Sequence, residues 1–194
     1  MVMEDKFNSK PMEDAELYFV NKYLVRNKYG VWFGNPVFDE EQVKAAVETE
    51  ILPAALQGNR GAVQCLLTMN GDAVDEAFEK IQDQIEKLAE EGDLHCQCYI
   101  ANELSSFYNE WGVLNEEHDN GKKLVRYLKN VAENHDEDVE RERARVLLWM
   151  AFSNGHGVKK DPEEAAKWFD YSEDNFQAFL DRLVREGNNR SVVS

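Results

Sequence analysis

Two glycines inside an otherwise helical stretch constrain the fold of this chain most. The stretch runs from Ala144 to Phe169 and reads ARVLLWMAFSNGHGVKKDPEEAAKWF. Apolar residues recur at helical spacing on both sides of Gly155 and Gly157, and glycine permits the backbone conformations of a tight turn. Asp161 can cap a second helix, because Asp, then Pro, then acidic residues is typical of a helix start. The stretch therefore predicts two helices joined by a short turn.

A second copy of this pattern lies about 44 residues earlier in the chain. The residues that correspond are Leu104, Tyr108, Gly112, Tyr127 and Leu128 in the earlier copy, and Leu148, Phe152, Gly157, Trp168 and Phe169 in the later one. A weaker unit runs from Gly61 to Glu91. Because a single helical hairpin cannot bury its own apolar face, the units must stack on one another.

The pattern resembles the Sel-one-like repeat, a relative of the tetratricopeptide repeat, with the form A-x3-L-x3-Y-x2-G-x-G-V-x2-D-x3-A-x2-W-x3-A. The residues that match it are Ala144, Leu148, Phe152, Gly155, Gly157, Val158, Asp161, Ala165 and Trp168. The resemblance is clear over residues 142–172, degraded over 95–134 and weak over 60–92, and the first 57 residues fall outside it. It implies that the matching residues are structural and that none is catalytic.

The expected fold class is all-α, an α/α solenoid of about three stacked helical hairpins. An N-terminal helical extension, residues 1–57, is expected to pack on the repeat region, residues 58–194, in one continuous domain that ends in a capping helix. Long helices are expected over 12–28 and 72–91, and Asp39 with Gln42 three residues later predicts another helix start. No segment alternates apolar and polar residues for long enough to demand a strand.

Residues 29–38, YGVWFGNPVF, form a short apolar segment bounded by glycines and a proline. It is expected to be extended or looped. In one interpretation it packs over the open end of the first helices. In the other it is an exposed contact for a partner through Trp32 and Phe33, since aromatic residues are common at interfaces.

The charge balance limits the partners. The chain has 38 acidic and 22 basic residues, a net charge of −16. This argues against nucleic acid and anionic membranes as partners, and it favours a basic protein or simple solubility. No apolar run approaches the roughly 20 residues that span a bilayer, and the N-terminus lacks the apolar region of a secretory signal. A cytoplasmic location is expected.

The sequence offers little chemistry. The three cysteines are a poor disulfide framework. His95, Cys96 and Cys98 invite a metal-site interpretation, but Cys-x-Cys on a helix points the thiols to different sides and no second Cys/His cluster follows. Burial of these cysteines is favoured instead. Phosphate loops and the common hydrolase motifs are absent from the sequence. We therefore expect no catalytic residues, no cofactor and no metal site.

The resemblance implies a binding protein. Proteins with such repeats act as adaptors through the concave face of a curved solenoid, and some small bacterial ones are immunity proteins that neutralise a competitor's toxin. Size and acidity favour a cytoplasmic immunity protein that binds a basic toxin domain, because opposite charges speed association. A generic adaptor or regulatory scaffold is the alternative. A hydrolase of the cysteine-rich repeat type is less favoured, since this chain lacks the regular cysteine pairs.

The resemblance also indicates where a partner would bind. In a stack of hairpins the first helices line the concave face, and the exposed positions expected there are Asn102, Ser106, Asn109, Arg145, Trp149 and Ser153. Trp149 stands where the family usually has glycine. Such a large aromatic residue either fills the groove between hairpins, which is favoured, or projects from it toward a partner.

Overall fold

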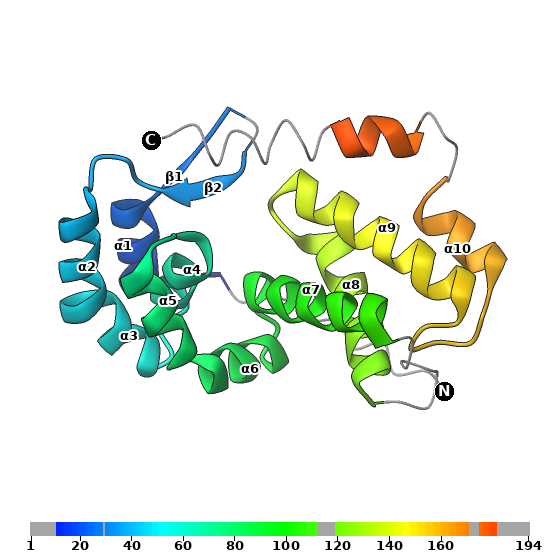
Figure 1. The fold of residues 1–194 in the computed structure, drawn as a ribbon, viewed down its shortest axis with the longest axis horizontal. Helices are drawn as coiled ribbons and strands as arrows, with labels where there is room; N and C mark the ends of the chain where they lie inside the picture. The colour runs from blue at the N-terminus through cyan, green and yellow to red at the C-terminus, as the bar shows by residue number, and fades with distance from the viewer. Residues whose placement is uncertain (1–10, 29, 112–118, 171–174, 182–194) are drawn as a thin grey trace. The chain divides into compact units, whose positions relative to one another are not determined.

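A computed structural model describes residues 11–28, 30–111, 119–170 and 175–181, although the side chains of 106–111 lie outside this description. The described chain is mostly helical, in agreement with the expected all-α class (Figure 1). It divides into two compact units, Met1–Cys96 and Gln97–Ser194. None of the described helices is long and apolar enough to cross a membrane.

The first unit contains short helices and one hairpin. Its elements are α1 (Asp14–Tyr23), β1 (Leu24–Arg26), β2 (Trp32–Gly34), α2 (Glu40–Ala46), the π-helix η1 (Val47–Ile51), α3 (Leu52–Leu56), α4 (Arg60–Thr68), α5 (Asp72–Glu79) and α6 (Gln82–Glu90). The expected capping box at Asp39 is present, because the Asp39 carboxylate accepts from the backbone N–H of Gln42 at 2.8 Å. Helix α4 supplies much of the core, with Ala62, Val63 and Cys65 fully buried.

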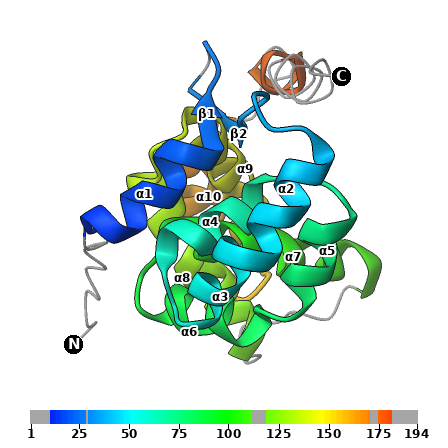
Figure 2. The same cartoon turned by 90° about the vertical axis from the view of Figure 1, so that its left-hand side faces the viewer.

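Helices α1 and α4 lie side by side and cross at a glycine (Figure 2). A Cβ atom on Gly61 would lie 1.9 Å from the carbonyl oxygen of Glu16. Only glycine lets the two backbones approach this closely. The crossing joins helices on both sides of residue 57, and the first unit includes both.

The expected helix over 12–28 is wrong at its C-terminal end. Helix α1 stops at Tyr23, and the chain enters a β-hairpin in which β1 pairs antiparallel with β2, Val25 opposite Phe33. Asn27 makes the turn, since its backbone N–H donates to the Val31 carbonyl at 3.0 Å and its side chain accepts from the Val31 N–H at 3.1 Å. Gly30 supplies a left-handed φ of 79°. The expectation that no strand forms is therefore wrong for these few residues.

The expected helix over 72–91 is divided into α5 and α6. Ile81, at the break, is fully buried and has left helical geometry, with φ −110° and ψ 12°. Ala77, Ile81 and Ile85 follow one another at intervals of four residues. In a straight helix of 3.6 residues per turn, residues at this spacing rotate progressively away from a single face. The break between α5 and α6 changes the direction of the chain, so that all three side chains are buried.

The second unit contains the longest of the described helices together with the short α10 (Pro162–Trp168). Helix α7 (Leu94–Trp111) leads into it, and α8 (Asp119–Asn134), α9 (Asp138–Asn154) and α10 follow. Helix α9 packs against both α8 and α10 (Figure 1). Buried apolar residues from α8 and α9 form the core: Leu124, Tyr127, Leu128, Val131, Ala144, Leu148, Ala151 and Phe152. Residues 175–181 are helical, and Phe179 is buried.

The turn between α9 and α10 confirms the two helices expected over 144–169. Gly155 ends α9 with a left-handed φ of 82°, and its N–H donates to the Ala151 carbonyl at 2.8 Å. Gly157 has φ 68°, and a Cβ there would lie 2.2 Å from the carbonyl oxygen of Gly121 in α8. Asp161 then caps α10 by accepting from the backbone N–H groups of Glu163 and Glu164.

Candidate functional site

The two aromatic residues expected to contact a partner lie on β2. Trp32 and Phe33 are both half-buried, and because they are neighbours in a strand their side chains point to opposite faces of the hairpin. The guanidinium of Arg26 lies 4.4 Å from the Trp32 ring centroid. The most exposed large apolar residue near the hairpin is Val37, at 79 %. Val37 was not among the predicted binding residues, although its place beside Pro36 in a turn indicated exposure.

Three of the expected binding residues share one stripe of α9. Arg145, Trp149 and Ser153 are four residues apart and so lie above one another on the helix. Arg145 is exposed, whereas Trp149 and Ser153 are half-buried. This intermediate exposure is compatible with both roles that we considered for Trp149.

Asn102, on α7, does not lie beside the α9 stripe of Arg145, Trp149 and Ser153. Its side-chain amide donates to the Cys98 sulfur at 3.7 Å, and the Cys98 thiol donates to Glu140 Oε2 at 3.3 Å. Successive residues of an α-helix are rotated by about 100° around its axis, so residues 140 and 149 are half a turn apart. Glu140 therefore lies on the side of α9 opposite the stripe that contains Arg145 and Trp149. The structure therefore does not bring Asn102 together with the other three. The side chains of Ser106 and Asn109 lie outside the described residues.

All three cysteines are free thiols, as the odd count indicated. Burial raises the pKa of Cys65 to about 12. Burial, and then the neighbouring Glu140 carboxylate, raise the pKa of Cys98 well above its usual value, and burial followed by Asp93 does the same for Cys96. A thiol with a raised pKa is protonated at neutral pH and is a poor nucleophile. This chemistry fits packing and hydrogen bonding better than catalysis.

The first unit contains a polar network that the sequence analysis missed. The Lys22 ammonium donates to the Tyr18 hydroxyl at 2.7 Å and to Glu50 Oε2 at 2.9 Å, and the Tyr23 hydroxyl donates to the same oxygen at 2.8 Å. The ammonium also lies over the rings of both tyrosines, 5.1 and 4.9 Å from their centroids. Tyr18 and Lys22 are one turn apart on α1, which the sequence did show. Glu50 comes from η1, and nothing in the sequence pattern placed it there.

Charge–charge and hydrogen-bond contacts shift the pKa values in this network. Hydrogen bonds from Lys22, and then from Tyr23, hold the pKa of Glu50 below its ordinary value. Hydrogen bonds to Tyr18, Tyr23 and Glu50 raise the pKa of Lys22. The network thus keeps one ammonium and one carboxylate ionised near the surface, where it ties α1 to η1.

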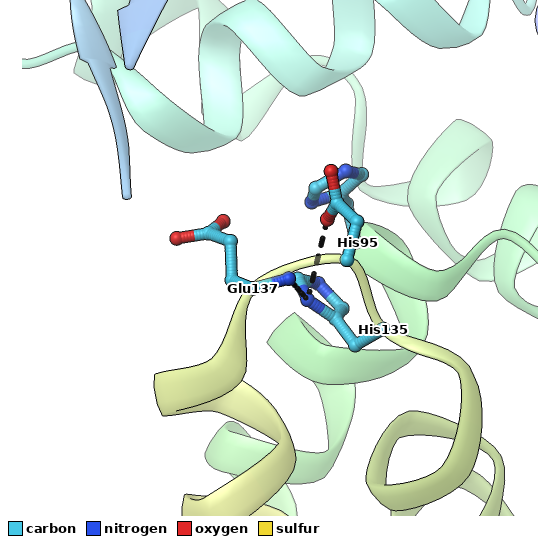
Figure 3. A group of neighbouring side chains, drawn as sticks. His95, His135 and Glu137 are labelled. Carbon is cyan, nitrogen blue, oxygen red and sulfur yellow. Dashed lines mark hydrogen bonds and ion pairs between the residues drawn. The ribbon is translucent and has the colours of Figure 1, made fainter. Parts of the chain in front are cut away.

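The turn between α8 and α9 holds a buried histidine (Figure 3). His135 is 2 % exposed, and its Nδ1 accepts from the backbone N–H of Glu137 at 3.1 Å. The Asp136 carboxylate lies 3.5 Å from the same nitrogen. These three residues offer ligand atoms within 4.8 Å of one another. A metal-binding histidine usually donates its second ring N–H to an acceptor. Here Nδ1 itself accepts from the chain, which suits a ring that supports the turn.

The first unit has the larger net negative charge, because it has fewer basic residues than the second unit and the same number of acidic ones. Residues 1–96 contain 19 acidic and 9 basic residues, a net charge of −10. Residues 97–194 contain 19 acidic and 13 basic residues, a net charge of −6. The whole-chain charge of −16 is therefore divided unevenly.

Comparison with known proteins gives no match: no family model, no curated protein and no solved structure is similar to this chain. The resemblance to the Sel-one-like repeat over residues 142–172 therefore remains a prediction from the sequence.

Proposed function

We propose that this chain is a non-enzymatic binding protein, and that it is a bacterial cytoplasmic immunity protein that neutralises a cognate basic toxin domain. The observation that carries the proposal is the net charge of −16 on a chain of 194 residues. A charge of this size attracts a basic partner from a distance, speeds the encounter and disfavours acidic competitors.

The proposal includes a fold. We assign α7–α8 and α9–α10 as successive Sel-one-like hairpins of an α/α solenoid, with an earlier hairpin in the first unit. The contact of Gly157 with Gly121 supports this assignment, because it docks the turn of one hairpin closely on the second helix of the hairpin before it. In the repeat alignment Tyr127 in α8 corresponds to Trp168 in α10, and Tyr127 is fully buried whereas Trp168 is half-buried.

A generic adaptor built on the same repeat is the alternative. It would use the same half-buried aromatic residues, Trp32, Phe33 and Trp149, without a toxin as the partner. A hydrolase of the cysteine-rich repeat type is less favoured, because the three cysteines are free and two of them are buried.

The test is binding to a basic toxin domain encoded beside this chain's gene. We expect a one-to-one complex at low salt whose Kd rises steeply with salt concentration, because the attraction between exposed charges is screened. Absence of a complex at low salt would contradict the toxin-inhibitor proposal and leave the adaptor.

The same complex tests Trp149. If Trp149 lies in the interface, Trp149→Ala weakens binding and leaves the Tm unchanged. If it fills the groove between hairpins, the variant lowers the Tm and binding persists. Ser153→Ala, on the same stripe of α9, is the matched control for a small change at this surface.

A further inference from the structure

An asparagine followed by a glycine lies exposed in the link between α4 and α5, residues 69–71. Asparagine is a chemically labile residue. A following glycine increases this lability, because its backbone nitrogen can attack the side-chain amide with no side chain of its own in the way. The sequence contains three such steps, at Asn70, Asn120 and Asn154. The conformation around each step therefore decides which of them reacts.

The step at Asn70 is open. Asn70 and Gly71 are both exposed and lie outside the helices. Gly71 has φ 125°, and a Cβ atom there would have no heavy atom within 4 Å. Its carbonyl accepts from the backbone N–H groups of Val74 and Asp75, but among the described residues no group accepts a hydrogen bond from its own N–H. The nitrogen that must attack is therefore not tied to an acceptor.

The other two steps are held in helical structure. Asn154 is the last residue of α9, and the N–H of Gly155 donates to the carbonyl four residues earlier at 2.8 Å. Asn120 lies in the first turn of α8, and Gly121 is buried where Gly157 docks on it. Ring closure requires rotation about the Cα–C bond of the asparagine, away from the helical ψ of about −42°. This rotation would disrupt the end of each helix.

We propose that Asn70 is a site of spontaneous deamidation in the folded protein, and that the fold protects the other two steps. The Gly71 nitrogen forms a bond to Asn70 Cγ and loses its proton. The Cγ–Nδ2 bond breaks, ammonia leaves, and a succinimide ring remains. Water then opens the ring at one of its two carbonyls. Opening at Cγ leaves an aspartate, and opening at the backbone carbonyl leaves an isoaspartate, whose main chain runs through the side-chain carbons.

The two products change the link in different ways. An aspartate adds a negative charge beside the N-terminus of α5, where Gly71 provides no side-chain cap and negative charge is favourable. An isoaspartate adds a carbon atom to the main chain between Met69 and Val74, which are both buried and hold the two ends of the link. The first product should therefore keep the fold, and the second should loosen the connection between α4 and α5. The inference is independent of the proposed function.

The experiment follows all three steps in the full-length protein. The folded protein is incubated at mildly alkaline pH, and peptide mapping by mass spectrometry measures the conversion of each asparagine over time. We expect conversion at Asn70 to be at least about tenfold faster than at Asn120 and Asn154, because reaction at those two requires local opening of a helix end. In concentrated urea the three rates should converge. Equal rates in the folded protein, or an undiminished preference for Asn70 in urea, would overturn the proposal.

Two variants connect the chemistry to the link. Asn70→Gln keeps an amide but would have to close a larger ring, so conversion here should stop while the Tm is unchanged. Conversion that persisted in this variant would place the reaction elsewhere and overturn the proposal. Asn70→Asp has the charge of one product and should keep at least the Tm of the wild type. The isoaspartate fraction of aged wild type should melt at a lower Tm than Asn70→Asp, and an equal Tm would contradict the loosening of the link.

Discussion

Lys22 joins two helices through one side chain. Its ammonium contacts a hydroxyl, a carboxylate and two aromatic faces, so nearly every direction around it has a partner. About a third of the side chain stays exposed, and water screens an ion pair at such a place. The network therefore contributes more to the orientation of Glu50 than to the free energy of folding.

The pKa of Glu50 gives a direct test of this contact. Lys22→Met should raise the pKa of Glu50 toward its ordinary value, because the largest cause of the lowered pKa is the hydrogen bond from Lys22. The measurement is a ¹³C NMR titration of the Glu50 carboxyl. Lys44→Met, which removes an exposed lysine from α2, should leave that titration unchanged. An unshifted Glu50 in the Lys22 variant would contradict the assignment.

The lowered pKa of Glu50 makes the stabilisation from this contact depend on pH. A carboxyl whose folded pKa is lowered stabilises the folded state above its unfolded pKa of about 4.3, and this stabilisation is lost as the pH falls through the folded value. The stability difference between the wild type and Lys22→Met should therefore be present at about pH 7 and should shrink as the pH falls below the unfolded pKa of about 4.3. Urea unfolding above and below this pKa measures it.

At the scale of elements, the α9–α10 turn depends on one contact between backbones. Gly157→Ala should destabilise the second unit by about 2–4 kcal/mol, because the new Cβ both meets the Gly121 carbonyl at 2.2 Å and occupies a left-handed conformation. Gly155→Ala, in the same turn, meets neighbours only at 3.4 Å or more. It should cost about 1 kcal/mol, for the backbone conformation alone.

Urea unfolding followed by the circular dichroism of the helices measures both changes. Equal losses for Gly155→Ala and Gly157→Ala would show that the approach to Gly121 has no energetic importance. A helix turn that is docked on its neighbour should instead respond much more strongly at Gly157.

Local chemistry made some elements predictable. The caps at Asp39 and Asp161 and the glycine turn at Gly155 depend on residues close together in sequence, and the sequence analysis located all three. Helical spacing likewise predicted α9, although the helix begins at Asp138, before the first residue of the recognised stretch.

Other features depend on tertiary contacts and were not predictable. The β1–β2 hairpin has only three residues in each strand, too few for an alternating pattern to stand out. The break at Ile81 arises because burial on both sides overrides helix propensity. The separation of Asn102 from the α9 stripe depends on which side of α7 faces α9. The sequence of a single helix does not show this orientation.

At the scale of the whole molecule, the excess of acidic residues carries an energetic penalty. Like charges repel in the compact state, and the repulsion is relieved when the chain expands. Exposed acids one turn apart, such as Glu76 and Glu79 on α5, add local repulsion, and Glu79 also lies at the negative end of the helix dipole.

Salt should therefore stabilise the protein. Raising NaCl from about 0.05 M to about 0.5 M screens the repulsion and should raise the Tm by about 2–4 °C. The double variant Glu76→Gln/Glu79→Gln should have a higher Tm at low salt and a smaller response to salt. If the Tm of the variant responded to salt as the Tm of the wild type does, the rise in Tm would come from salt acting on the solvent and not from screening of these carboxylates. Differential scanning calorimetry gives both values.

The extra residue in the π-helical turn η1 affects how the gene for this chain could have diverged from related genes. Leu52 donates its N–H to the carbonyl of Val47, five residues earlier, so this turn contains one residue more than an α-helical turn. A related gene that lacked one codon here would still encode a continuous helix. The residue in the place of Glu50 would then point about 100° away from Lys22. In any related chain, we therefore expect the extra residue and the lysine–glutamate pair to be present or absent together.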